Sequence, residues 1–391
     1  MKICFLFNHD AAHQVAHSIG LAAVLAEQYA DIETVIAFGS PAIRAEIEQH
    51  LTSAQIAALH WHDLSLGSFM QALLAIPNKL APVQRLARLY VAAKFLHHCD
   101  MIVSTERTCL TLKRRWGNDG PKFAYIPHGS GDRNVAYHPA LKDFDLMLLS
   151  GQKLVDQMVA NDIVPAEKCR VIGYPKFDAL TGRKPEKFFD NDNPVFLYNP
   201  HFDPVLSSWY DEGEAILEWF FQRQDQYNLI FAPHVMLFFK TTHISPEYKK
   251  GRRRPDIAEK YRNVPNIRID LEGPRLFDMS YTLAADAYIG DVSSQVYEFL
   301  HRVRPVFFID THSEGHSVDS PIYEFWLNGL VANNAAELCE KLPHWREIGD
   351  EYRAEQIRLL GYTMSVDPNR SAAERGAEAL AETIYSPKIP G

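Results

Sequence analysis

The segment from Ala284 to Leu300 combines a short apolar run, a tight turn and the start of a helical pattern. Ser293 or Ser294 can cap that helix, and the backbone N–H groups of its first turn then point toward any ligand in front of it. Because the helix dipole favours negative charge at this end, the turn is suited to a diphosphate. Glu298 lies four residues after Ser294 on the same helical face, where its carboxylate can accept hydrogen bonds from ribose hydroxyls. The pattern favours a nucleotide-binding turn, and an ordinary helix start with a solvated Glu298 is the alternative.

Three further motifs place a histidine directly after a predicted strand and a proline: Pro127-His128, Pro200-His201 and Pro233-His234. His128 stands on a Gly-rich turn, and Gly129 permits a close approach to a substrate because it has no side chain. Neutral histidines also cap strand ends through their ring nitrogens, so a structural role is the alternative for each. The repetition favours a functional role.

A fourth motif, Gly173-Tyr-Pro175-Lys176, follows the last strand predicted in the first half of the chain. The Gly-x-Pro sequence predicts a sharp turn, and Lys176 can contribute positive charge to a site. A plain turn at the end of a domain is the alternative.

Several classes of active site lack their motifs in this sequence. There is no Gly-x-Ser-x-Gly elbow and no Walker P-loop, which disfavours serine hydrolases and P-loop kinases. The strand-end motifs contain no His-x-x-x-His pair with a nearby carboxylate, so we expect no metal site.

Size and composition favour a cytoplasmic protein of two domains. The chain has 391 residues, 47% of them hydrophobic and 23% charged, which fits two globular cores. The net charge of −9 argues against a nucleic-acid partner. Five scattered cysteines without a C-x-x-C spacing indicate reduced core residues, and the apolar run at the start is too short for a signal peptide or a membrane span.

Short apolar runs alternate with helical patterns, as in parallel sheets with crossover helices. The first half contains the predicted strands Lys2–Phe7, Glu33–Phe38, Met101–Ser104, Lys122–Ile126, Leu146–Ser150 and Arg170–Ile172, with a helix over Gln14–Gln28. The second half contains Val195–Tyr198, Leu229–Ala232, Ile267–Asp270, Ala287–Ile289 and Val306–Ile309. A polar, turn-rich linker separates the two series.

We therefore expect an α/β protein with two Rossmann-like domains that face a central cleft, because ligands bind at the carboxyl ends of such strands. The expected domains are residues 1–180, on the acceptor side, and 190–370, for the nucleotide donor. The last segment, 371–391, is expected to carry a helix over Ala372–Tyr385 that packs back toward the junction.

Two stretches are rich in basic residues. Lys249–Arg254 is predicted to be a solvated loop, with a site for a polyanionic acceptor or an acidic membrane as the alternative. Leu80–His98 is predicted to be a core-facing helix, with an interfacial helix as the alternative.

Five motifs follow one another along the chain: His128-Gly129-Ser130, Gly173 to Asp178, Asn199-Pro200, Pro233-His234 and Gly290 to Glu298. Taken in this order, they resemble the motif series of the CDP-glycerol glycerophosphotransferase family, which makes teichoic acid and related capsule polymers. The resemblance covers roughly residues 120 to 310. It implies a GT-B architecture, in which the C-terminal domain holds the nucleotide and the N-terminal domain faces the acceptor.

The resemblance also implies roles for single residues. His128 matches the cleft histidine of the family's first domain, and His234 matches the histidine of its second domain. Ser293 and Ser294 match the serines that hold the diphosphate, and Glu298 matches the acidic residue near the ribose. The chain departs from the family at four positions. Ser130 stands where the family has Thr, Lys176 where it has Arg, Val292 where it has an aromatic residue, and Val235 where it has Pro.

The expected enzyme transfers a glycerol-phosphate, polyol-phosphate or glycosyl group from a CDP- or CMP-linked donor to a hydroxyl of a cell-surface glycan or teichoic-type polymer. His128 and His234 are the expected catalytic residues. Donor binding is expected from Asp291, Ser293, Ser294, Gln295 and Glu298, and substrate positioning from Gly129, Ser130, Lys176, Asn199 and His201. We expect no cofactor, and we expect peripheral contact with the inner face of the membrane.

Three alternatives are open. A non-hydrolysing UDP-sugar 2-epimerase shares the layout and a Ser/Gly turn followed by glutamate, but its His-Arg-Arg-Glu-Asn run and the paired acidic residues of its first domain are not found in the sequence. A sugar transferase of the Kdo or sialic-acid kind uses CMP-activated donors. A non-catalytic scaffold that holds nucleotide or glycan belongs to another class of protein.

Overall fold

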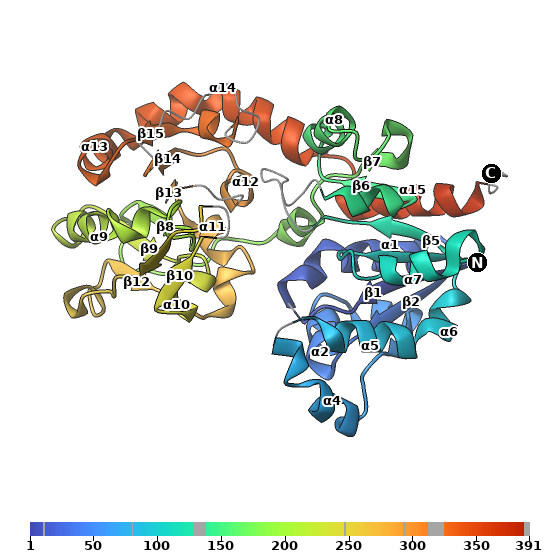
Figure 1. Cartoon of the computed structure of the whole chain (residues 1–391). Helices are drawn as coiled ribbons and strands as arrows, with labels where there is room; N and C mark the ends of the chain where they lie inside the picture. Colours follow the sequence, from blue (N-terminus) through green and yellow to red (C-terminus); the bar gives the residue numbers. More distant parts are fainter. Residues whose placement is uncertain are drawn as a thin grey trace. The chain divides into compact units, whose positions relative to one another are not determined.

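The computed structural model describes residues 1–10, 12–79, 81–127, 138–245, 248–291, 295–311 and 324–386. The chain forms two compact units (Figure 1). Unit 1 comprises Met1–Thr181 together with Gly361–Gly391, and unit 2 comprises Gly182–Leu360. Unit 1 thus includes the chain from Gly361 onward.

Unit 1 contains a seven-stranded parallel sheet in the order β3-β2-β1-β4-β5-β6-β7. Its strands are β1 (Lys2–Phe7), β2 (Glu33–Phe38), β3 (His60–Asp63), β4 (Met101–Ser104), β5 (Lys122–Tyr125), β6 (Leu146–Leu149) and β7 (Cys169–Val171). Its helices are α1 (Ile19–Gln28), α2 (Pro41–Gln49), α3 (Ser53–Ala58), α4 (Ser68–Leu74), α5 (Val83–Val91), α6 (Ala93–His97), α7 (Leu110–Trp116), α8 (Gln152–Ala160) and α15 (Ala372–Tyr385).

Unit 2 contains a six-stranded parallel sheet in the order β12-β9-β8-β13-β14-β15 and a two-stranded antiparallel sheet, β10-β11. Its strands are β8 (Val195–Asn199), β9 (Asn228–Phe231), β10 (Thr242–Ile244), β11 (Gly251–Arg253), β12 (Ile267–Ile269), β13 (Ala287–Gly290), β14 (Val306–Ile309) and β15 (Leu330–Ala332). Its helices are α9 (Gly213–Phe221), α10 (Met236–Phe239), α11 (Ser280–Ala284), α12 (Gln295–Phe299), α13 (Ala335–Lys341) and α14 (Trp345–Met364), which continues into unit 1.

Each central strand is buried on both faces because helices cover both sides of its sheet. In β1, Ile3, Phe5 and Phe7 belong to one core, whereas Cys4 and Leu6 belong to the other. This alternation follows from the period of two along a strand. The first core is closed by α1 and α15, which contact each other, and the second by α5 to α8. The continuous apolar runs in the sequence are thus explained by burial on two sides.

The start of α15 is fixed to the end of the first strand series. Ser371 and Glu374 form a capping box at its N-terminus. The carboxylate of Asp178 accepts hydrogen bonds from the backbone N–H groups of Ala372 (3.0 Å) and Ala373 (2.8 Å). These contacts satisfy N–H groups that a helix start leaves without partners, so they hold the last helix in unit 1.

All eleven predicted strands are present, with ends that differ by at most one residue. The prediction missed β3, β15 and the β10-β11 pair. The edge strand β3 has the polar sequence HWHD and is not fully buried, so no apolar run marks it. The predicted helix over Gln14–Gln28 is instead a 3₁₀ helix, Ala12–His17, followed by α1.

The prediction of a solvated loop at Lys249–Arg254 is wrong from Gly251 onward. Gly251–Arg253 pairs with Thr242–Ile244 as strand β11. Arg252 binds Asp211 through two hydrogen bonds of 2.7 and 2.6 Å, and the buried Arg254 lies over the Phe238 ring. Strand pairing and these contacts order the basic residues.

Leu80–His98 contains two short helices, α5 and α6, in place of one long helix. Leu89 and Leu96 are buried, in agreement with a core-facing pattern. In the described part of the chain, no helix combines the length and apolar character needed to cross a bilayer.

Candidate functional site

Polar side chains gather at the carboxyl edge of the unit 2 sheet. Asn199 ends β8, and His201 follows two residues later. His234 lies just beyond β9, and Asp291 directly follows β13. Because β9, β8 and β13 are neighbours in the sheet, these residues come together at the edge where parallel α/β sheets bind ligands.

Asp291 is fully buried and fixes the loop that follows β8. One carboxylate oxygen accepts the backbone N–H of His201 at 2.8 Å. The other accepts the backbone N–H of Ser208 at 2.8 Å and its hydroxyl at 3.0 Å. These three hydrogen bonds satisfy the acceptor oxygens of the buried carboxylate. Asp291, expected to bind the donor, therefore holds the loop that carries His201.

The imidazole rings of His201 and His234 lie 5.4 Å apart between centroids. Phe202 contacts both rings, with centroid distances of 4.4 and 4.8 Å. These contacts bring together two of the three Pro-His motifs, although the two histidines are far apart in the sequence.

Both rings have the same hydrogen-bond pattern. The Nδ1 atom of His201 accepts the backbone N–H of Asp203 at 3.0 Å, and the Nδ1 atom of His234 accepts that of Met236 at 3.2 Å. A neutral ring whose Nδ1 accepts a hydrogen bond carries its proton on Nε2. The Nε2–H group of each neutral ring is thus a hydrogen-bond donor.

Asn199 links two strands of the site. Its Nδ2 donates to the carbonyl of Ala232 at 2.5 Å, and its Oδ1 accepts the hydroxyl of Tyr288 at 3.2 Å. Gly290 leaves room for that tyrosine, since a Cβ atom there would lie 2.4 Å from its ring. Asn199 is buried and acts within the framework of the site.

The strand and the helix predicted for the segment after Ala284 are present as β13 and α12. Gln295 begins α12, and Glu298 is half-buried one turn later. Val292, Ser293 and Ser294 lie outside the described residues.

In unit 1, His128, Gly129 and Ser130 also lie outside the described residues. Lys176 is half-buried in a 3₁₀ helix, Pro175–Leu180. The preceding turn requires glycine, because Gly173 has φ of +89° and a Cβ atom there would lie 2.1 Å from the guanidinium of Arg375.

The sequence reading missed a charged cluster at the carboxyl edge of the unit 1 sheet. Arg85 binds Asp10 at 3.3 Å and Glu106 at 2.7 Å, and Arg88 binds Asp10 at 3.0 Å. Asp10 follows β1 and Glu106 follows β4, which are neighbouring strands. The polar triplet Asn8-His9-Asp10 directly after the first strand was the available signal.

Burial raises the pKa of Asp10, but the guanidinium groups of Arg88 and Arg85 outweigh it and hold that pKa below its usual value. Asp10 is therefore a carboxylate at neutral pH. Within the described ranges, no group of three or more His, Cys, Asp or Glu side chains is placed to hold a metal ion.

No protein-family model matches the chain, and no curated protein matches it in sequence. Solved structures do match. The wall teichoic acid polymerase TagF with CDPG has a TM-score of 0.60 and 14% identity, over 98% of this chain and 88% of that chain. A putative UDP-N-acetylglucosamine 2-epimerase from Listeria monocytogenes has a TM-score of 0.64 and 11% identity, over 100% of this chain and 98% of that chain.

A third structure is the UDP-GlcNAc 2-epimerase from Neisseria meningitidis bound to UDP-GlcNAc, with a TM-score of 0.58 and 11% identity over 98% of this chain and 99% of that chain. At these identities the likeness concerns the fold. The chain has the α/β architecture of these GT-B-type enzymes, with two Rossmann-like domains built on parallel sheets.

Proposed function

We propose that the protein is a transferase that moves a glycerol-phosphate, polyol-phosphate or glycosyl group from a CDP- or CMP-linked donor to a hydroxyl of a cell-surface glycan or teichoic-type polymer. The observation that carries the proposal is the pair His201 and His234 at the carboxyl edge of unit 2. In each ring Nδ1 accepts a backbone N–H, so the neutral ring carries its proton on Nε2, from where it can be donated to an anionic oxygen.

In the proposed reaction, the acceptor oxygen forms a bond to the transferred phosphorus or anomeric carbon. The bond from that atom to the nucleotide breaks, and the nucleotide leaves with the electron pair. The acceptor proton passes to a base, a role that we assign to His128 on the resemblance. His234 and the serine turn at Ser293 and Ser294 stabilise the negative charge of the leaving nucleotide.

The GT-B-type fold supports a nucleotide-linked substrate, because the matching structures include a teichoic acid polymerase with CDPG and an epimerase with UDP-GlcNAc. Gln295 and Glu298 are proposed to contact the nucleotide, with Glu298 at the ribose. Lys176, Asn199 and His201 are proposed to position the substrate. Asn199 does so indirectly, because it holds the surrounding loops together with Asp291.

A UDP-sugar 2-epimerase is the second candidate, and one observation favours it. Asp10 and Glu106 are acidic residues of unit 1 that both bind Arg85, so the fold supplies an acidic pair that the sequence did not reveal. An epimerase needs no acceptor, which separates the two candidates.

The deciding experiment incubates the purified chain with CDP-glycerol, CMP-sialic acid and UDP-GlcNAc, each with and without a glycan acceptor. Release of CMP that depends on the acceptor supports the transferase. Conversion of UDP-GlcNAc to its 2-epimer without an acceptor replaces that proposal with the epimerase. Nucleotide binding without any turnover leaves a non-catalytic scaffold.

A further inference from the structure

The segment that follows the second histidine of the candidate site is strongly basic. Met236–Arg254 contains six lysine and arginine residues and one acidic residue, Glu247, although the net charge of the protein is −9. It forms α10 and the hairpin of β10 and β11. Figure 1 shows α10 and β10 next to each other in unit 2, where the ring of His243 binds the carbonyl oxygen of Leu237. This cationic region has no role in the transfer chemistry described above.

The two faces of the hairpin carry different side chains, as the period of two along a strand requires. On the inner face, His243 is paired with Arg252 across the strands. His243 is buried, and Arg252 binds Asp211 through two hydrogen bonds. On the outer face, Ile244 and Arg253 are exposed. The hairpin is thus fixed from the inside and presents a separate outer face to a partner.

The region carries positive charges that no carboxylate neutralises. Four exposed cations form no ion pair within the described residues: Lys240, Lys249, Lys250 and Arg253. Lys249 has φ of +53°, in the left-handed region that favours glycine. The chain therefore places a positive charge at a position where the backbone alone favours a residue without a side chain.

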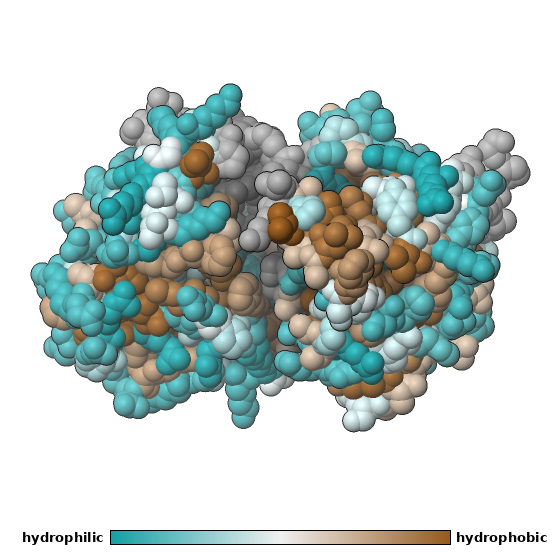
Figure 2. Space-filling view, turned by 60° about the horizontal axis from the view of Figure 1, so that its bottom comes forward, coloured by the Kyte–Doolittle hydropathy of each residue, from teal (hydrophilic) through white to brown (hydrophobic). Residues whose placement is uncertain are grey.

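Apolar side chains lie among these cations. Phe239, at the end of α10, is 74% exposed, and Ile244 is 70% exposed. Figure 2 turns the bottom of Figure 1, where α10 and β10 are drawn, toward the viewer, and apolar and hydrophilic side chains are interspersed on that face of unit 2. A polyol phosphate chain alternates phosphates with short carbon segments, so cations and apolar side chains together match its two kinds of group.

The hairpin also borders the histidine pair of the candidate site. The ring of Phe202 lies 4.8 Å from that of His234 and 6.3 Å from that of His243, between ring centroids. Arg252 donates to the carbonyl oxygen of Pro204, which belongs to the same loop as Phe202, at 3.5 Å. A polymer whose end lies at the histidine pair can therefore continue over the hairpin within unit 2.

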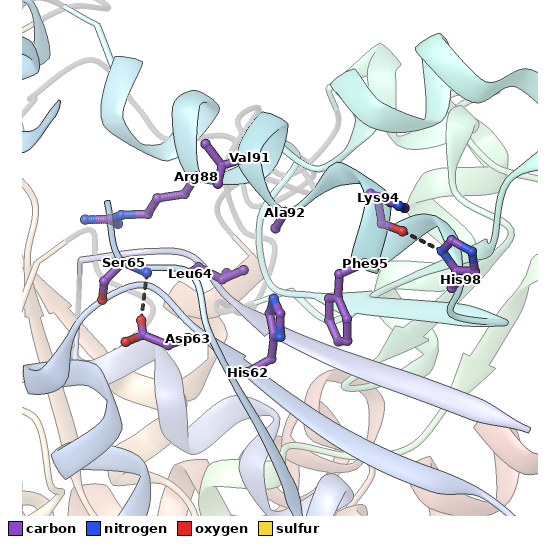
Figure 3. Close-up of a pocket in the computed structure, with 10 residues that line it drawn as sticks. All are labelled: His62, Asp63, Leu64, Ser65, Arg88, Val91, Ala92, Lys94, Phe95 and His98. Atoms are coloured by element: carbon purple, nitrogen blue, oxygen red, sulfur yellow. Dashed lines mark hydrogen bonds between the residues drawn. The ribbon is translucent and has the colours of Figure 1, made fainter. Parts of the chain in front are cut away.

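Unit 1 contains another basic place, a pocket of about 580 Å³ (Figure 3). Arg88 and Lys94 belong to its lining, but Arg88 binds Asp10, and Asp63 adds a negative charge. Among the lysines and arginines of this lining, all of them described, Lys94 is the one without an ion pair. A chain of phosphates is attracted most strongly where several unpaired cations lie together, which favours the hairpin.

We propose that a surface of unit 2 binds the acceptor polymer, a chain of polyol phosphate units, behind the end that reacts at the histidine pair. This hairpin surface consists of six residues: Phe239, Lys240, Ile244, Lys249, Lys250 and Arg253. Its cations pair with phosphates, and its apolar side chains contact the carbon segments between them. The inference rests on the proposed transferase, because it takes the acceptor of that reaction to be a polyanion.

The test measures binding of the full chain to a fluorescent oligomer of glycerol phosphate by fluorescence anisotropy, without a nucleotide donor. Binding should tighten with oligomer length and weaken with salt, because salt screens exposed charges. K249Q/K250Q should weaken binding by about tenfold, since each exposed charge contributes modestly. K249R/K250R keeps both charges and should bind like the parent. So should K94Q/K341Q, the matched control that removes two exposed lysines elsewhere.

A second variant, K249G, separates the charge from the backbone. Its thermal midpoint should change little, because relief of the strain at φ of +53° offsets the greater freedom of glycine in the unfolded chain. Its binding to the oligomer should nevertheless weaken. A lysine with a merely structural role would give the opposite result, an altered midpoint with unchanged binding.

Equal binding of the oligomer by K249Q/K250Q and the parent overturns the inference, and so does a parent that binds no oligomer. Acceptor-dependent transfer would stand in both cases. If K249Q/K250Q loses binding to phosphatidylglycerol vesicles but not to the oligomer, the surface is a membrane contact and the inference is wrong. A parent that binds the oligomer through this surface but transfers no group from any donor supports the inference and contradicts the proposed transferase.

Discussion

The backbone N–H of His201 donates a 2.8 Å hydrogen bond to the carboxylate of Asp291, which lies 90 residues away in the sequence. The loop after β8 is thereby fixed by the residue that directly follows β13. Since the same carboxylate also holds Ser208, one buried side chain fixes the backbone of the loop from which the His201 ring approaches His234.

Replacement of Asp291 by Asn should destabilise unit 2 and disturb the histidine pair. The amide of asparagine keeps one acceptor oxygen, but its NH₂ group cannot accept a hydrogen bond. A backbone N–H that the second carboxylate oxygen had accepted therefore loses its partner. The expected loss is about 1–3 kcal/mol in the free energy of unfolding. Urea unfolding measures it, with the exposed Asp225→Asn as control. Equal urea midpoints for D291N and D225N would contradict this role.

Replacement of His234 by Ala should reduce kcat/KM for the nucleotide donor by about 10²-fold or more, as expected for loss of a donor to a leaving phosphate. His234→Gln should retain part of the activity because an amide N–H can stand near the Nε2 position. The exposed His344→Gln is the control and should be unchanged. If H234A turns over donor at the rate of H344Q, His234 is not part of the site.

The protein should lose stability between about pH 6.5 and pH 4 through His301. Burial, followed by the charges of Arg304 and Arg302, lowers the pKa of His301 to about 4. The unfolded chain, with an ordinary histidine pKa near 6.5, then binds more protons than the folded chain over this range. The free energy of unfolding therefore decreases as the pH falls.

Urea unfolding at pH 7 and pH 5 measures this effect for the parent and for His301→Gln. The variant should show a smaller difference between the two pH values because it cannot bind the proton. An unchanged difference would assign the acid sensitivity to other groups.

Gly173→Ala should destabilise unit 1 by more than about 1 kcal/mol, because alanine is strained at φ of +89° and its Cβ collides with Arg375. Gly182→Ala provides the comparison, since Gly182 has φ of +73° but open space around a Cβ atom. The thermal midpoint should fall further for G173A than for G182A. Equal thermal midpoints of the two variants would mean that backbone strain explains the whole loss of stability and that the collision with Arg375 adds nothing.

Much of the fold could be predicted because buried parallel strands are continuous apolar runs. Val306–Ile309 and Lys2–Phe7 were predicted to the residue for that reason. His60–Asp63 was missed, since an edge strand needs no such run. Gly251–Arg253 was missed because its pairing with Thr242–Ile244 depends on the chain around it, and the basic composition gave no sign of it.

For the candidate site, the sequence by itself identified the polar residues that follow the strands, including His201, His234 and Asp291, because strand ends and prolines are local features. The tertiary structure decided which of them meet. It placed the two imidazoles 5.4 Å apart and gave Asp291 a framework role. It also joined Asp10 to Arg85 and Arg88. Strand order brings distant residues to one edge of a sheet, and strand order is a property of the packed chain that no local pattern contains.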